Sequence, residues 1–185
     1  MRAFLSSKMK AIFEGYKCID GTTNGPDTSD LCQTKPEMAP WLAIGFGEMK
    51  HISVERVTIF NVLRYVKGIG QTKDLTFRLT DELPKSSEEM STDGEYLGEG
   101  LHLLPEGVNI DLASAGRSDP GWEKTYGRYL LIQMDNQKSF PFSPMSLNLK
   151  EVFVHGIIRE AGTWHSFMYM NIPVPVNWIC KLSEL

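Results

Sequence analysis

Five residues with oxygen-bearing side chains lie close together near the start of this sequence. They are Asp20, Thr22, Asn24, Asp27 and Ser29, and residues 20–29 are called the acidic turn below. Carboxylate, amide and hydroxyl oxygens, together with the backbone carbonyls of a tight turn, are ligands that Ca²⁺ takes in proteins. The same residue types are also ordinary turn formers that hydrogen-bond their own backbone. The sequence therefore leaves two interpretations open: a calcium site, or an acidic turn without a metal.

Two of the three cysteines flank the acidic turn. A disulfide between Cys18 and Cys32 would join the two ends of this loop, and Cys180 would then remain free or pair outside the chain. Three reduced thiols are the alternative, because spacing alone does not decide the redox compartment.

The residue patterns of common catalytic sites are absent from the sequence. The four histidines lack the His-Glu-x-x-His spacing of zinc hydrolases, and there is no Gly-x-Ser-x-Gly motif or phosphate-binding loop. His155 lies within an expected strand, where a structural role is the more ordinary interpretation. We therefore expect a protein that is not an enzyme.

Apolar and polar residues alternate along most apolar segments, which is the period of β-strands. Residues 52–61 keep this alternation only if a β-bulge lies near Glu55 and Arg56. The best helical candidate is the short segment from Ser6 to Glu14. Strands are expected at residues 41–47, 52–61, 75–79, 108–112, 129–134 and 147–155.

Short strands separated by turn residues favour an all-β fold, and we predict a jelly-roll β-sandwich of about eight antiparallel strands. The polar segment 81–100 is expected to be a loop, with at most a short strand near residues 96–97. Prolines at alternate positions, Pro173 and Pro175, exclude a central strand near the C-terminus. We therefore predict a sandwich at residues 1–157 and a C-terminal extension at 158–185.

Composition limits the class of partner. The chain has 185 residues, 42% hydrophobic and 23% charged, with a net charge of −4, which suits one globular domain and does not suit a nucleic-acid binder. No apolar run reaches the roughly 20 residues that span a bilayer. The first residues lack the apolar core of a signal peptide, so we expect either a protein that is not exported by that route or a fragment.

Six segments, taken in order, resemble the motifs of one family. They contain an Asp-Gly turn, a Cys-x-Thr, a Pro-Trp strand, an Ile-x-Val strand, a Gly-Arg-Tyr strand and a closing Leu-x-x-x-Glu-Val strand. This order is similar to that of the discoidin domain, also called the coagulation-factor type C domain, which has the galactose-binding-like fold, and of the related F-type lectins. The segments are residues 18–21, 32–34, 39–47, 52–61, 126–132 and 147–156.

The resemblance does not extend to the fucose-binding residues of the F-type lectins. Those lectins hold the sugar with a histidine and two arginines, one of them just after the strand that ends in asparagine. After Asn61 this chain continues Val62-Leu63-Arg64 in place of Arg-Gly-Asp, and the Cys32–Thr34 segment contains no histidine. The resemblance therefore implies the fold without the fucose triad.

Members of this family often hold a structural calcium in the acidic turn, and the resemblance places a glutamate of the closing strand beside it. The calcium candidates are therefore Asp20, Asn24, Asp27, Ser29 and Glu151.

The resemblance also implies a ligand surface on loops at the opposite end of the sandwich. Lysine and arginine donate to sugar hydroxyls, sulfates or carboxylates, and a tyrosine ring stacks on the apolar face of a sugar. The alternative is an ordinary solvated loop. The candidates are Lys35, Arg64, Tyr65 and Lys67.

Together these features predict a non-catalytic extracellular recognition module that binds carbohydrate, or a cell-surface or matrix partner, with a possible structural calcium. The alternative is an adhesion or structural fragment of a larger multidomain protein, with no sugar ligand of its own. Neither interpretation includes a nucleic-acid partner.

Overall fold

A computed structural model describes most of the chain. The described residues are 1–12, 14–23, 31–47, 52–61, 74–100, 108–111, 127–135, 144–160 and 163–169. They form one 3-10 helix, η1 (Gly15–Cys18), and ten strands: β1 (Arg2–Leu5), β2 (Cys32–Gln33), β3 (Trp41–Gly45), β4 (Ile52–Asn61), β5 (Leu75–Thr80), β6 (Glu95–Gly100), β7 (Val108–Asp111), β8 (Tyr129–Met134), β9 (Asn148–Glu160) and β10 (Thr163–Tyr169).

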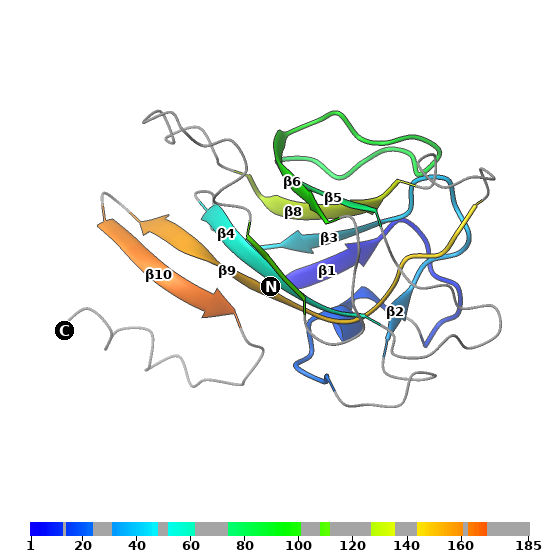
Figure 1. The fold of residues 1–185 in the computed structure, drawn as a ribbon, viewed down its shortest axis with the longest axis horizontal. Helices are drawn as coiled ribbons and strands as arrows, with labels where there is room; N and C mark the ends of the chain where they lie inside the picture. The colour runs from blue at the N-terminus through cyan, green and yellow to red at the C-terminus, as the bar shows by residue number, and fades with distance from the viewer. Residues whose placement is uncertain are drawn as a thin grey trace.

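The strands form two antiparallel sheets, which confirms the predicted all-β sandwich (Figure 1). Sheet A has the strand order β1-β3-β8-β5-β6, and sheet B has the order β10-β9-β4-β7 with β2 paired to β9. The predicted bulge in β4 is confirmed by a register shift between Val54 and Arg56 in its pairing with β9.

The main core lies between the sheets and follows from the alternation of apolar residues. In β3, Leu42 and Ile44 are fully buried in this core, as are Val57 and Ile59 of β4. Because successive side chains of a strand point to opposite faces, β3, β5 and β8 contribute every second residue to the core.

A second apolar cluster lies on the other face of sheet A. It contains the buried residues Trp41, Ala43 and Leu131, with Phe4, Leu83 and Tyr129 packed against them. Leu83 belongs to the segment of residues 81–94, which connects β5 to β6 and is called the sheet A loop below. This loop supplies an apolar cover for a face that would otherwise be open to water.

The buried side chain of Gln133 in β8 holds the sheet A loop in place. Its Nε2 donates to the carbonyls of Ala39 at 2.9 Å and Glu89 at 3.3 Å. Its Oε1 accepts from the backbone N–H of Ser91 at 2.8 Å. One amide thus uses both its donor and its acceptor capacity to connect the loop to the sheet.

The helical expectation for residues 6–14 was wrong within the described part of that segment. The backbone N–H of Ser6 donates to the Trp41 carbonyl and that of Met9 to the Gln33 carbonyl, so these groups pair with distant strands. The helical turn comes directly afterwards, in η1. Segment 81–100 is a loop as expected, but its strand, β6, has six residues.

The predicted boundary at residue 157 falls inside β9, which continues to Glu160. β10 then returns beside it, with Thr163 opposite Glu160 and Tyr169 opposite Val154 (Figure 1). The sheet therefore continues into the predicted extension as far as residue 169. Among the described residues, no helix is long and apolar enough to cross a membrane.

Candidate functional site

The start of the acidic turn is fixed to the sandwich by a disulfide. Cys18, the last residue of η1, is bonded to Cys32 in β2, with their Cα atoms 5.4 Å apart. The Cys18 sulfur also lies 3.4 Å from the carbonyl oxygen of Leu149 in β9. The disulfide candidate from the sequence is therefore present, and it connects η1 to sheet B.

The turn itself closes on the carboxylate of Glu151. The backbone N–H groups of Gly21 and Thr22 both donate to Glu151 Oε2, at 2.8 and 3.1 Å. Asp20 Oδ1 also accepts from the Thr22 N–H, at 2.9 Å. Gly21 has a positive φ of 86°, a conformation that glycine adopts without a steric penalty. The Asp-Gly pair is thus required by the shape of this turn.

Glu151 is a fully buried acid with a strongly perturbed pKa. Its exposed fraction is 0%, and Oε1 accepts from the Val152 N–H, at 3.3 Å. The pKa of this carboxyl is raised from 4.5 to about 7: burial raises it most, the charge of Asp20 also raises it, and the backbone hydrogen bonds from Gly21, Val152 and Thr22 lower it. Near neutral pH, burial and a second acid therefore oppose a negative charge at this position.

The chemistry of this pair fits a hard cation. Glu151 and Asp20 are carboxylates close enough to interact, and Ca²⁺ would offset both the desolvation of Glu151 and the repulsion between the two acids. Asn24, Asp27 and Ser29 lie outside the described residues. Within the described ranges, no group of three or more His, Cys, Asp or Glu side chains could hold a metal.

Of the four ligand candidates, only Lys35 is described; Arg64, Tyr65 and Lys67 lie outside the described residues. Lys35 is exposed, and its backbone N–H donates to Ser7 Oγ at 2.9 Å.

Strand register relates Lys35 to β9. Cys32 of β2 and Asn61 of β4 both pair with Leu149, on opposite sides of β9. Lys35, two residues after β2, and the point where the chain leaves β4 therefore both lie near the start of β9.

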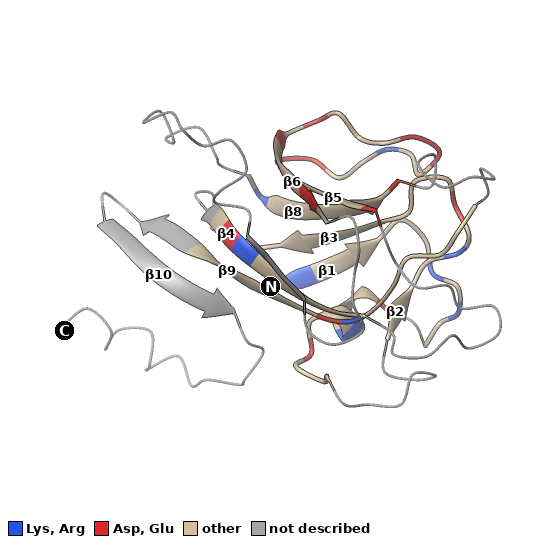
Figure 2. Cartoon of the chain, in the orientation of Figure 1, with Lys and Arg blue, Asp and Glu red and all other residues tan. Residues whose placement is uncertain are grey.

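Acidic residues gather at the sheet A loop and the following strand. Figure 2 shows them along the loop and on β6. The one basic side chain of β5, Arg78, turns inward to the loop backbone: its Nη1 donates to the carbonyls of Thr92 at 3.3 Å and Gly94 at 3.1 Å. This face of the molecule is therefore unsuited to an anionic ligand. The acids are Asp81, Glu82, Glu88, Glu89, Asp93, Glu95 and Glu99.

His155 has the structural environment that its place in a strand indicated. Its Nδ1 lies 3.5 Å from an Arg56 guanidinium nitrogen, and its Nε2 lies 3.4 Å from Thr58 Oγ1. Burial, and then the positive charge of Arg56, lower the pKa of this histidine. An imidazole held between two side chains of β4 is a contact between paired strands.

Comparison with known proteins identifies the fold. No protein-family model matches the chain, and no curated protein matches it. A fucolectin from striped bass (Morone saxatilis) serum superposes with a TM-score of 0.63 at 18% identity, over 88% of this chain and 48% of that one. The fold is the galactose-binding-like β-sandwich. This chain thus spans about half the length of the fucolectin.

Two bacterial modules share the galactose-binding-like fold. A fucose binding module of Streptococcus pneumoniae gives a TM-score of 0.54 at 18% identity, covering 85% of this chain and 90% of that one. A Clostridium perfringens CBM32 module, solved with GalNAc-β-1,3-galactose, gives 0.54 at 11% identity, covering 83% of this chain and 93% of that one. These likenesses establish the galactose-binding-like fold of this chain, and the fold predicted from the sequence is confirmed.

Proposed function

We propose that this protein is a non-catalytic carbohydrate-binding module. The observation that carries the proposal is the sandwich itself, which matches a fucolectin, a fucose binding module and a CBM32 domain over at least 83% of this chain. All three are named for, or were solved with, a sugar. Because unrelated functions can share a fold, the site residues must be tested directly.

The proposed sugar surface is formed by loops at one end of the sandwich. It includes Lys35 after β2 and the candidates Arg64, Tyr65 and Lys67, which follow β4 in sequence. Cationic donors and one aromatic ring suit hydroxyl-rich ligands, and the replacement of the fucose triad favours a sugar other than fucose. The disulfide supports an extracellular location, since structural disulfides persist mainly in oxidising compartments.

We also propose that Ca²⁺ stabilises the acidic turn without taking part in sugar contacts. Asp20 and Glu151 supply two carboxylates, and Asn24, Asp27 and Ser29 supply the remaining candidate oxygens. A metal bound to the folded state alone raises stability by mass action. Millimolar Ca²⁺ should therefore raise the melting temperature of the wild type and leave that of Asp27→Ala unchanged. The Asp93→Ala variant, which removes an exposed acid of the sheet A loop, should respond as the wild type does.

A glycan array with the purified chain, in Ca²⁺ and in EDTA, tests the function. We expect binding to a restricted set of glycans, and we expect Arg64→Ala to weaken that binding while leaving the melting temperature unchanged. If no class of glycan binds in either Ca²⁺ or EDTA, the proposal is contradicted and the adhesion or structural alternative is favoured. Equal melting temperatures in Ca²⁺ and EDTA would rule out the calcium site and leave the sugar proposal intact.

A further inference from the structure

The negative charge of this protein is concentrated in one short part of the chain. Residues 81–95 contain six acidic side chains and one basic side chain, whereas the whole chain has a net charge of only −4, so the rest of the chain is slightly positive. Figure 2 shows acidic residues along the sheet A loop and on β6. A one-sided charge of this kind attracts partners of the opposite charge. The six acids are Asp81, Glu82, Glu88, Glu89, Asp93 and Glu95.

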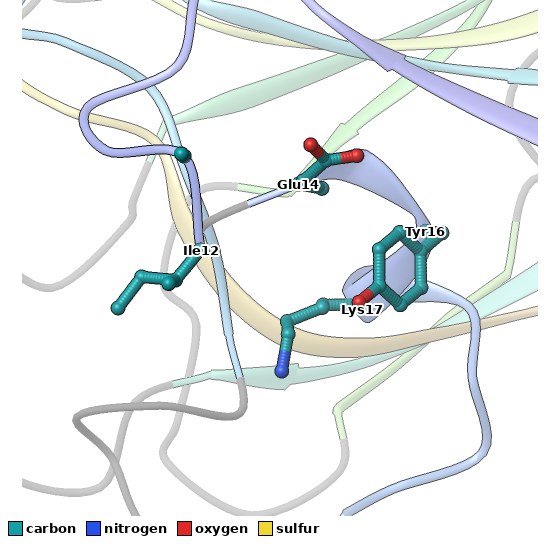
Figure 3. A pocket seen from close by; sticks show the side chains of 5 residues that line it. Ile12, Glu14, Tyr16 and Lys17 are labelled. Carbon is teal, nitrogen blue, oxygen red and sulfur yellow. The ribbon is translucent and has the colours of Figure 1, made fainter.

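These carboxylates are not paired with neighbouring cations. Five of the six side chains are exposed, and none of the six has an ion-pair partner among the residues that the structure describes. Glu14 is the contrasting case, because it lies beside a surface hollow near η1 (Figure 3) and pairs with Lys8 at 3.0 Å. Arg78 of β5 is engaged elsewhere: its Nη1 donates to two loop carbonyls, and its guanidinium carbon lies 5.6 Å from the centre of the Tyr96 ring. The sheet A loop therefore presents unpaired carboxylates to solvent.

The acids lie next to the outer edge of sheet A. β6 is the last strand in the order of this sheet and, among the described strands, pairs with β5 alone. A strand in this position has backbone N–H and C=O groups along its outer side that can pair with another chain. Its pairing with β5 is continuous from Gly98 to Gly100 and again from Glu95 to Tyr96, with a register shift between these two parts. Two of its six residues are glycines, which place no side chain in the way of an approaching backbone.

Charge selects the kind of strand that this edge accepts. If a second copy of the chain paired through β6, Glu95 and Glu99 would approach the same acids of that copy, and facing like charges destabilise a strand pair. A segment that carries lysine or arginine brings the opposite charge instead. Tyr96 lies opposite Arg78, which contacts the sheet A loop, so its side chain lies on the face of sheet A that this loop covers. Since side chains alternate along a strand, every second residue of an added strand would lie on that face, beside the loop acids.

We propose that β6 binds an extended basic segment of another protein, which adds to sheet A as a further strand and in which lysine or arginine alternates with uncharged residues. The backbone of β6 supplies the hydrogen bonds, and the loop acids supply the charge that selects this partner. Tyr96, which is 47% exposed, offers its ring to the alkyl part of one of the basic side chains. This surface shares no residue with the proposed sugar surface or the acidic turn, so the inference does not depend on either.

The test is an NMR titration of the ¹⁵N-labelled full chain with an eight-residue peptide of alternating lysine and threonine that has blocked ends. We expect the peptide to shift the amide signals of residues 95–99, and to bind more weakly at high salt because these charges are screened. The same peptide with every second backbone nitrogen methylated keeps its charges but loses strand donors, and it should bind at least tenfold more weakly. The combined variant Glu88→Gln, Glu89→Gln and Asp93→Asn should lower the affinity threefold or more, whereas Glu14→Gln, at the paired acid, should leave it unchanged.

Each other outcome contradicts the proposal in a different way. Equal binding of the methylated peptide would show that charge attracts the segment without any added strand. Equal binding of a peptide of alternating glutamate and threonine, or no shift at residues 95–99, would show that the ligand class or the edge is wrong. If the same amides shift with protein concentration in the absence of peptide, the occupant is a second copy of the chain. The glycan array gives its result independently of all of these, so the two proposals can fail separately.

Discussion

Glu151 combines two properties that rarely occur together in one side chain. It is fully buried, yet its Oε2 organises a surface turn through the N–H groups of Gly21 and Thr22. An ionised carboxylate accepts these bonds best, while burial and Asp20 favour the protonated form. The Glu151 carboxyl therefore changes its protonation state near neutral pH. Either a proton or a bound cation would offset the cost of burying its negative charge.

Without Ca²⁺, stability should depend on pH through this residue. Its pKa is raised from 4.5 to about 7 in the folded state, so between these values the folded protein binds a proton that the unfolded chain has lost. Stability from this source is complete below about pH 4.5 and is lost as the pH rises through about 7, by roughly 3 kcal/mol in total. The measurement is urea unfolding in EDTA at pH 5 and pH 8.

The matched variant is Glu151→Gln, whose amide oxygen still accepts from Gly21 and Thr22 but does not titrate. Its stability difference between the two pH values should be smaller than that of the wild type by most of this amount. Identical pH profiles for the two proteins would show that Glu151 does not titrate in this range.

Individual residues of the candidate site could be predicted only where they belong to a recognisable sequence motif. Asp20, Glu151 and the cysteine pair follow from ordered motifs, and the structure places all four within one contact region. The close approach of Gly15 in η1 to Ala3 in β1 carried no sequence signal, because these two residues meet only in the folded chain.

At the level of elements, alternation located the strands but not the cover of sheet A. Trp41 and Leu131 lie on the outward face of their strands, where polar residues would be expected. The sheet A loop that buries them has no apolar period, and Leu83 is its main apolar contribution. A loop that packs through one side chain and several backbone groups leaves no pattern that a sequence reading detects.

Removing the Gln133 side chain should release this loop. Gln133→Ala leaves the carbonyls of Ala39 and Glu89 and the N–H of Ser91 without their partner, at a cost of about 2–3 kcal/mol. Limited trypsin digestion should then cut the folded variant after the exposed Lys85, which the wild type resists. Gln33→Ala, at the second glutamine that is buried in the described part of the chain, should destabilise the protein without opening that cleavage site.

For the whole molecule, the order of motifs predicted the sandwich correctly, whereas β9 continues beyond the expected C-terminal limit. The proline-containing segment suggested an end near Gly156, but the local apolar pattern of Ile157 and Ile158 continues β9 instead. Backbone pairing of Ser53 with Ile157 and of Ile52 with Ile158 joins this stretch to β4. The placement of β10 depends on its pairing with β9, which composition does not encode.

Truncation just before the predicted boundary at residue 157 tests two properties separately: whether the core folds, and whether β10 protects the edge strand β9 from self-association. Among the side chains that the structure describes, every buried residue of the main core precedes Gly156, so a chain of residues 1–156 should retain its near-ultraviolet circular dichroism. It should nevertheless self-associate more than residues 1–169, because β9 loses β10 and becomes an exposed edge. Sedimentation velocity measures the difference, and an unfolded 1–156 chain would show that β10 is needed for the core.

The position of β8 predicts which amide hydrogens of the protein exchange most slowly with solvent. It is the middle strand of sheet A, with Ile132 facing the main core and Leu131 facing the outer cluster, both essentially inaccessible. Its amide hydrogens are thus shielded on two faces and bonded on two edges, and they should exchange with deuterium only when the entire protein opens. Exchange at β8 should therefore report the global unfolding equilibrium.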